Sequence, residues 1–284
     1  MRLCYLIGYP VDHSLSAVMH NTAFQELSLG FRYELRSVSP ETLEAFVSHD
    51  LKATEVRGAN VTIPYKVSLV KHMDEVDALA ARIGAVNTVV NDDGWLKGYN
   101  TDGLGALRAL EEAFGDLHGA KVVILGAGGA AKAIGYHLSI VARELIILNR
   151  TLSNASELVE GIARYSECRA SLSAHLLNRG CLKEVLKDAD IVINATPLGM
   201  SPNVGETPIS SDLLRPGFLV FDIVYNPMRT RLLKEAEKAG AKTLDGVSML
   251  VYQGVESFKI WTGREAPEDL MRRAAVKALG ADLG

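Results

Sequence analysis

A glycine-rich turn between an apolar strand and a helix most restricts what this chain can fold into. The segment VVILGAGGAAKA runs from an apolar stretch at residues 122–125 into a turn with Gly126 and Gly128, and a helical pattern follows at once. In this context a G-x-G-x-x-G/A pattern is specific, with Ala131 in its third position. The apolar stretches ELIILNR, ADIVINATP and FLVFDIVYN follow, separated by helical patterns. Such runs are typical of a parallel sheet covered on both faces, so we predict a doubly wound Rossmann domain.

The first hundred residues predict a second, mostly parallel α/β sheet. Short β-rich runs at residues 3–10, 31–38 and 58–64 alternate with helical patterns at 16–28, 40–51 and 65–77. Two further β-rich arms flank Asp93-Gly94 within residues 85–100, which predicts an antiparallel hairpin at the sheet edge. We expect residues 1–103 and 248–284 to form this first domain and residues 104–247 to form the Rossmann domain. Ligands are then expected in the cleft between the two.

Composition and charge favour a small molecule as the partner. The formal net charge is −4, and acidic and basic residues are interspersed along the sequence. The sequence therefore has no basic stripe of the kind that binds nucleic acid or an anionic membrane. No uncharged apolar stretch reaches the roughly 20 residues of a membrane span. The three cysteines are far apart and form no CxxC pair, so we expect neither a disulfide framework nor a metal site. A reduced, cytoplasmic setting fits this pattern, and a homodimer is left open.

The end of the second Rossmann strand indicates which dinucleotide is bound. Roughly 20 residues after the first glycine, NAD enzymes carry an acidic residue that holds the ribose 2′-hydroxyl. This chain has Asn149, Arg150 and Thr151 there, and the planar guanidinium of Arg150 suits a 2′-phosphate. NADP is therefore favoured, with a solvated arginine at a strand end as the alternative. The turn expected to cradle the pyrophosphate consists of Gly126, Ala127, Gly128, Gly129 and Ala130.

Polar residues lie where the predicted strands of the first domain end. Singly, each has an ordinary explanation as a helix cap, a strand residue or a solvated lysine. Together, however, the motifs HSLS, GANVTIPYK, GAVNTVV, GYNTDG, GAGGAAKA, NRT, INATPLGM, VYNP and DGVSMLVYQG occur in the order found in the shikimate dehydrogenase family. The resemblance runs over nearly the whole chain.

The resemblance implies reversible NADPH-dependent reduction of 3-dehydroshikimate to shikimate, a step of aromatic amino-acid biosynthesis. It implies Lys66 and Asp102 as the catalytic pair, and Ile223 and Gly246 at the nicotinamide end of the cofactor. The residues that it implies for the substrate are Ser14, Ser16 and Tyr225 at the carboxylate, and Asn60, Thr62, Asn87 and Gln253 at the ring hydroxyls.

The chemistry of the pair is consistent with that activity independently of the resemblance. When hydride reaches a carbonyl carbon, negative charge grows on the oxygen, and an ammonium such as that of Lys66 stabilises this charge and donates the proton. Asp102 orients the amine and balances its charge. The same pair accepts the hydroxyl proton in the reverse direction.

Two alternatives stay open. NADP-preferring members of the family often carry a second basic residue four positions after the arginine of NRT, where this chain has Asn154. The alternative enzyme is thus a quinate/shikimate dehydrogenase with NAD or dual cofactor use. The alternative from another class is a protein that senses NADP without catalysis, against which the presence of Lys66 and Asp102 argues. We expect no fused dehydratase within these 284 residues, because the two dehydrogenase domains already use that length.

Overall fold

The computed structural model describes residues 1–280, and these divide into two compact units. Unit 1 comprises Met1–Gly105 and the described part of Leu250–Gly284, and unit 2 comprises Ala106–Met249. Two helices continue across the boundaries between the units, α4 (Asp102–Phe114) and α9 (Gly246–Thr262). The last four residues of the expected segment 248–284 lie outside the described residues.

Unit 1 contains a six-stranded mixed sheet in the order β2-β1-β3-β5-β6-β4. Its strands are β1 (Arg2–Gly8), β2 (Phe31–Ser37), β3 (Val56–Val61), β4 (Glu75–Val76), β5 (Thr88–Asp92) and β6 (Trp95–Tyr99). β1 pairs in parallel with β2 and β3, whereas β5 is antiparallel to both β3 and β6. The predicted hairpin is confirmed, and Asp93 and Gly94 have the positive φ values that its turn needs. It does not form the sheet edge, because the short β4 pairs outside β6.

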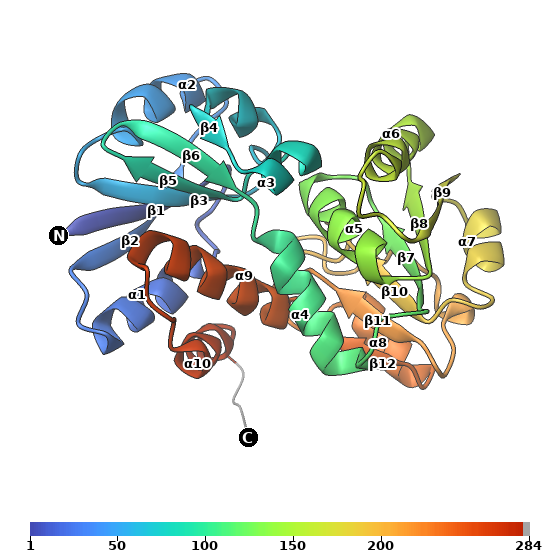
Figure 1. The fold of residues 1–284 in the computed structure, drawn as a ribbon. Coiled ribbons are helices and arrows are strands. Elements are labelled where there is room, and N and C mark those ends of the chain that lie inside the picture. The colour runs from blue at the N-terminus through green and yellow to red at the C-terminus, as the bar shows by residue number, and fades with distance from the viewer. Residues whose placement is uncertain (281–284) are drawn as a thin grey trace. The chain divides into compact units, whose positions relative to one another are not determined.

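Helices cover both faces of this sheet (Figure 1). On one face lie α1 (Ser16–Glu26), α9 and α10 (Glu268–Ala278). On the other lie α2 (Leu43–Ala45), which continues as a π-helical turn over Phe46–Asp50, and α3 (Ala78–Ile83). Gly58 lets α9 approach β3 closely, because a Cβ there would lie 2.7 Å from Nε1 of Trp261. That indole donates to the carbonyl of Val89 at 2.9 Å, which ties α9 to β5.

One predicted helix of unit 1 is wrong. Residues 65–77 contain a 3-10 turn, Ser68–His72, and the short strand β4, and Lys66 lies in the turn that precedes Ser68. The carboxylate of Asp74 accepts from the backbone N–H of Leu96 at 2.7 Å, which ties the chain to β6 and ends the helical path. The helix instead begins at Ala78, where the Asp77 side chain accepts from the N–H groups of Leu79 and Ala80.

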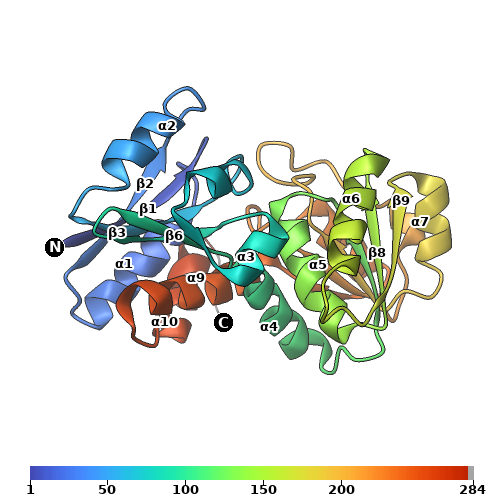
Figure 2. The same cartoon turned by 45° about the horizontal axis from the view of Figure 1, so that its top comes forward.

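Unit 2 contains the predicted doubly wound sheet, with six parallel strands in the order β12-β11-β10-β7-β8-β9. The strands are β7 (Lys121–Leu125), β8 (Glu144–Asn149), β9 (Ser171–Leu176), β10 (Ile191–Asn194), β11 (Leu219–Asp222) and β12 (Lys242–Leu244). The helices are α5 (Gly129–Val141), α6 (Leu152–Ala163), α7 (Arg179–Val185) and α8 (Arg231–Lys238), with a 3-10 turn at Ser211–Leu213. Figure 2 shows α5 and α6 along one face of this sheet.

Burial on both faces explains why the four central strands of unit 2, β7, β8, β10 and β11, have continuous apolar sequences. Every residue of β7 is buried. Val123 and Leu125 join the core that also holds Leu182 of α7 and Leu232 of α8, while Leu145 of β8 lies by Gly135 of α5. None of the helices within residues 1–280 is long and apolar enough to span a bilayer.

Candidate active site

The expected substrate residues of unit 1 gather at one edge of its sheet. β1 and β3 are parallel neighbours, so Gly8 and Val61 end at the same edge. β5 starts and β6 ends there too, because Thr88 pairs with both Asn60 and Tyr99 in antiparallel register. The segments that follow or precede these strand ends carry the polar motifs of the sequence. The strand topology therefore explains why motifs far apart in the chain converge.

Lys66 and Asp102 form a close ion pair at this edge. The Nζ of Lys66 lies 2.6 Å from the Oδ2 of Asp102. The side chains are only 18% and 5% exposed, so water screens the pair less than it screens a surface ion pair. Asp102 begins α4, and its backbone N–H donates to the amide oxygen of Asn100. A charge-assisted hydrogen bond of this length fixes the amine relative to the carboxylate.

Asn87 holds the other oxygen of the Asp102 carboxylate. Its Nδ2 donates to Asp102 Oδ1 at 3.0 Å, and its Oδ1 accepts from the backbone N–H of Thr101 at 2.8 Å. Because a backbone N–H can only donate, this second bond fixes which end of the Asn87 amide faces the carboxylate. Asn87 Nδ2 also lies 3.3 Å from Oε1 of Gln253 on α9. Asn87, Asp102, Lys66 and Gln253 thus form one hydrogen-bonded group.

The amide of Asn60 is engaged within the protein. Its Oδ1 accepts from the hydroxyl of Tyr33, and its Nδ2 lies within 3.2 Å of the Asn87 carbonyl, the Thr88 hydroxyl and the Ser257 hydroxyl. Asn60 is 4% exposed. Asn87 is equally buried, at 2% exposed, and its amide is likewise bonded within the protein, so burial does not separate the two residues.

The remaining predicted polar residues of unit 1 lie near other parts of the same edge. Ser14 and Ser16 stand at the start of α1, with their hydroxyls 3.2 Å apart. Thr62 directly follows β3, and its backbone N–H donates to the carbonyl of Ile7 at the end of β1. Thr62 and Ser14 are partly exposed, so their hydroxyls are accessible to a ligand in a way that Asn60 is not.

The glycine turn of unit 2 has the geometry of a phosphate cradle. Gly126 has φ +110°, and a Cβ there would lie 2.9 Å from the carbonyl oxygen of Ala195 after β10. Gly126 therefore brings the carboxyl ends of β7 and β10 together, where the strand order reverses. A Cβ at Gly128, by contrast, would meet open space, and α5 begins at the next residue. Free N–H groups and the positive end of the helix dipole thus face an accessible gap.

The other expected cofactor residues lie at the same edge of unit 2. Asn149 ends β8, whose Leu148 carbonyl accepts from the N–H of Gly126 at 2.7 Å. Arg150 and Thr151 follow it and are exposed. Ile223 and Gly246 are brought together, because a Cβ at Gly246 would lie 2.3 Å from the Ile223 carbonyl oxygen. The glycine turn therefore has candidate cofactor residues on both sides, Asn149 to Thr151 on one and Ile223 with Gly246 on the other, as an extended dinucleotide requires.

The sequence interpretation missed a buried carboxylate beside these residues. Asp222 ends β11 fully buried, and it accepts from Asn194 Nδ2 at 2.9 Å, the N–H of Val224 at 3.1 Å and the Thr230 hydroxyl at 2.7 Å. Burial raises the pKa of Asp222 to about 6, although the three hydrogen bonds oppose this effect. Asp222 fixes the start of the segment that carries Ile223 and Tyr225.

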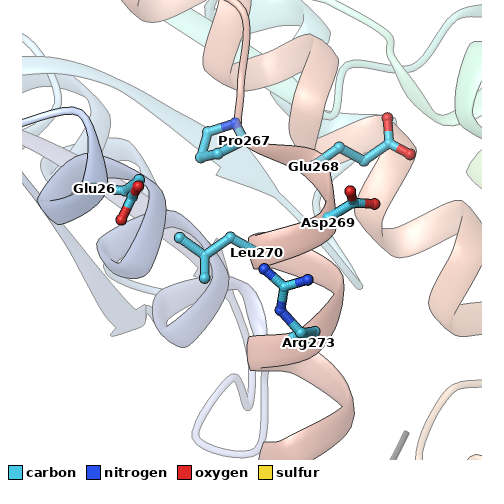
Figure 3. A pocket seen from close by; sticks show the side chains of 6 residues that line it. All are labelled: Glu26, Pro267, Glu268, Asp269, Leu270 and Arg273. Atoms are coloured by element: carbon cyan, nitrogen blue, oxygen red, sulfur yellow. The ribbon is translucent and has the colours of Figure 1, made fainter.

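A shallow hollow of unit 1 lies apart from the predicted residues. Figure 3 shows it at the start of α10, with a volume of about 480 Å³ and a lining of Glu26, Pro267, Glu268, Asp269, Leu270 and Arg273. None of the expected site residues lines it. Within residues 1–280, no group of three or more His, Cys, Asp and Glu side chains is arranged to hold a metal ion.

Comparisons with known proteins agree with this arrangement. Three family models match the chain: the shikimate dehydrogenase substrate binding domain at residues 6–89, the shikimate / quinate 5-dehydrogenase at 108–223 and the shikimate 5′-dehydrogenase C-terminal domain at 246–276. The shikimate dehydrogenase (NADP(+)) of Methanosarcina acetivorans is 48% identical over 99% of both chains.

Solved structures extend the likeness to the fold. A shikimate dehydrogenase in complex with NADP+ is 42% identical, with a TM-score of 0.90 over 98% of this chain and 96% of that one. The enzyme from Thermus thermophilus in complex with NADP(H) and shikimate is 34% identical, with a TM-score of 0.86 over 98% of this chain and all of that one.

Proposed function

The chain belongs to the shikimate dehydrogenase family, and we propose that it catalyses the reversible NADPH-dependent reduction of 3-dehydroshikimate to shikimate. The observation that carries this proposal is the largely buried ion pair of Lys66 and Asp102, 2.6 Å apart at the strand ends of unit 1. An ammonium held beside a carboxylate is suited to proton transfer at a carbonyl oxygen.

The catalytic roles follow from the charges of the pair. When bound, the cofactor supplies the hydride for the carbonyl carbon. Lys66 stabilises the negative charge that grows on the oxygen and gives it a proton. Asp102 keeps the amine oriented, since Asn87 holds the far carboxylate oxygen. In the direction of oxidation, the neutral amine of Lys66 accepts the hydroxyl proton.

The substrate roles divide by the chemistry of the side chains. We assign the carboxylate to the hydroxyls of Ser14, Ser16 and Tyr225, which can all donate. The ring hydroxyls are assigned to Asn60, Thr62, Asn87 and Gln253, whose groups can donate or accept.

The cofactor roles rest on the open gap at Gly128 and on the charge at Arg150. The turn formed by Gly126, Ala127, Gly128, Gly129 and Ala130 is proposed to hold the pyrophosphate against the start of α5. Arg150 with Asn149 and Thr151 would hold the 2′-phosphate, and Ile223 with Gly246 would line the nicotinamide end. The relative and the solved structures named for NADP support this preference over NAD.

We further propose residues 1–103 and 248–284 as the substrate domain and 104–247 as the cofactor domain. A cytoplasmic setting is proposed on the three free cysteines, of which Cys4 is buried. A homodimer remains a prediction that light scattering would test.

The experiment that tests the proposed function is an initial-rate assay that follows NAD(P)H absorbance. Purified protein is given shikimate or quinate, each with NADP or NAD. We expect fast NADP reduction with shikimate and rates at least ten-fold lower for the other combinations. Comparable rates with quinate and NAD would move the chain to the sister enzyme. Tight NADP binding without turnover of either substrate would contradict an enzyme and favour a sensor.

A further inference from the structure

Three buried hydroxyl groups lie in contact beneath the catalytic pair of unit 1. They belong to Thr88 at the start of β5, Thr101 before α4 and Ser257 on α9, and all three residues are at most 2% exposed. The Ser257 oxygen lies 2.8 Å from the Thr88 oxygen and 3.3 Å from that of Thr101, which are 3.4 Å from each other. We call these three side chains the hydroxyl cluster. The resemblance assigned no role to Thr88 or Ser257.

The hydroxyl cluster is bonded directly to Asn87. The hydroxyls of Thr88 and Thr101 lie 3.0 and 3.2 Å from Asn87 Oδ1, and Thr101 also accepts from Asn87 Nδ2 at 2.9 Å. Asn87 in turn donates to Asp102, whose second oxygen binds Lys66. An unbroken path of hydrogen bonds therefore leads from the hydroxyl cluster to the catalytic amine.

Ser257 is the member of the hydroxyl cluster that connects the most elements. Its hydroxyl donates to the carbonyl of Gln253, one turn earlier on α9, at 2.9 Å. Because this leaves its lone pairs free, it accepts from Asn60 Nδ2 of β3 at 2.9 Å, and its oxygen lies 2.8 Å from the hydroxyl oxygen of Thr88 on β5. Ser257 thus fixes α9, which carries Gln253, against the two strands that carry Asn60 and Asn87.

We propose that Ser257 is a positioning residue for the reaction, which acts through Asn87 on the orientation of Asp102 and Lys66. This inference rests on the catalytic roles proposed for Lys66 and Asp102. Core packing alone would be served by alanine here, since a buried hydroxyl is no better than an apolar group unless its bonds are used. In this site every bond of the hydroxyl is directed at a residue that holds the active site.

Removal of the hydroxyl tests this proposal. In Ser257→Ala, the Asn60 amide loses the nearest of its three acceptors, so the network shifts toward the Asn87 carbonyl and the Thr88 hydroxyl. We expect kcat for shikimate to fall about ten-fold, while the KM for NADP stays within about two-fold, because the cofactor residues lie in unit 2. Ser139→Ala is the matched control: that serine is also fully buried and bonded to its own helix, at the carbonyl of Tyr136, but lies in unit 2.

A double-mutant cycle separates positioning from general destabilisation. If Ser257 acts through Lys66, its removal has little further effect on the residual kcat of Lys66→Ala, whereas a merely structural defect lowers kcat equally in both backgrounds. Equal losses, or an unchanged kcat in Ser257→Ala, would overturn the proposal.

Three further outcomes are distinguishable. Thr88→Val removes the neighbouring hydroxyl at similar volume. If Ser257→Ala does not fold, Thr88→Val replaces it in the double-mutant cycle with Lys66→Ala. Failure of both variants to fold would show that the hydroxyl cluster has a purely structural role. If the single variant Lys66→Ala keeps the kcat of wild type, the proposed catalytic roles are contradicted, and this inference, which depends on them, is contradicted too. Loss in Lys66→Ala with no loss in Ser257→Ala would contradict this inference only.

Discussion

The amine of Lys66 lies 2.6 Å from one carboxylate oxygen of Asp102, while the amide of Asn87 holds the other oxygen at 3.0 Å. Both oxygens are therefore in use before any substrate arrives, and the carboxylate cannot rotate without breaking one bond. A lysine on a flexible four-carbon stem gains a fixed position in this way. Preorganisation of this kind lowers the reorganisation that the reaction itself requires.

The first prediction concerns this pair. We expect Lys66→Ala to lower kcat by about 10²- to 10⁴-fold, because it removes the group that protonates the oxygen. The KM for NADP should change little, and steady-state kinetics with shikimate measures both constants. Lys71→Ala, in the 3-10 turn that follows, is the control and should retain its kcat. A kcat within two-fold of wild type in Lys66→Ala would show that another group transfers the proton.

The second prediction concerns the choice of cofactor. We expect Arg150→Ala to lower kcat/KM for NADP about 10- to 100-fold and to leave that for NAD nearly unchanged, since only NADP carries the 2′-phosphate. Initial rates with each cofactor at saturating shikimate give this ratio. Arg164→Ala, at the far end of α6, removes the same charge away from the turn. Equal losses with both cofactors would mean that Arg150 does not read the 2′-phosphate.

The sequence predicted those parts of the fold in which local pattern and tertiary structure agree. Four strands of unit 2, β7, β8, β10 and β11, are buried on both faces, so their apolar runs identify them, whereas the partly exposed edge strands β9 and β12 have no such run. Asp93-Gly94 has the backbone angles that a hairpin turn demands. The helix predicted at residues 65–77 was wrong because a side-chain contact determines the conformation of this segment. Asp74 is bonded to the backbone of Leu96, more than twenty residues later in the chain, and no local pattern reveals that. The sequence does contain the start and stop signals of α3, because Asp77 caps its first turn and Gly84 ends it.

The candidate site shows the same division. Lys66, Asp102, Asn87 and Gln253 were named from motifs, and the structure joins them through hydrogen bonds. Asn60 and Asn87 looked equivalent in the sequence, and the structure buries both, at 4% and 2% exposed, with the amide of each bonded within the protein. Ser257 was missed although it lies four residues after Gln253, hence on the same helix face, because a serine in a helix has no distinctive pattern.

The third prediction uses two glycines of one turn to separate binding from folding. In Gly128→Ala, the new Cβ meets open space and φ is −78°, so we expect unchanged stability but weaker NADP binding, because the methyl group fills the path of the pyrophosphate. In Gly126→Ala, φ of +110° and the contact with Ala195 should cost at least about 1 kcal/mol of unfolding free energy. Urea unfolding and NADPH fluorescence titration measure the two effects. Unchanged NADP affinity in Gly128→Ala would contradict the cradle.

The fourth prediction concerns the pH dependence of stability. Burial raises the pKa of Asp222 to about 6 from 3.8, so the folded state holds this proton more tightly than the unfolded state does. A group with a raised pKa contributes stability that is fully present below pH 3.8 and is lost as the pH rises through 6. Between pH 4 and pH 7, wild type should therefore lose about 2 to 3 kcal/mol of unfolding free energy that Asp222→Asn, which cannot ionise, retains.

Urea unfolding across that pH range measures this difference directly. The variant keeps an oxygen for the donors at Asn194 and Val224, and its amide can donate to the hydroxyl of Thr230, so its fold should be preserved. Asp212→Asn is the control, because its carboxylate is exposed and its pKa is lowered by Arg179 to about 2, which predicts no such loss above pH 4. Parallel pH profiles for wild type and Asp222→Asn would show that the three hydrogen bonds outweigh burial, and that Asp222 stays ionised in the fold throughout this range.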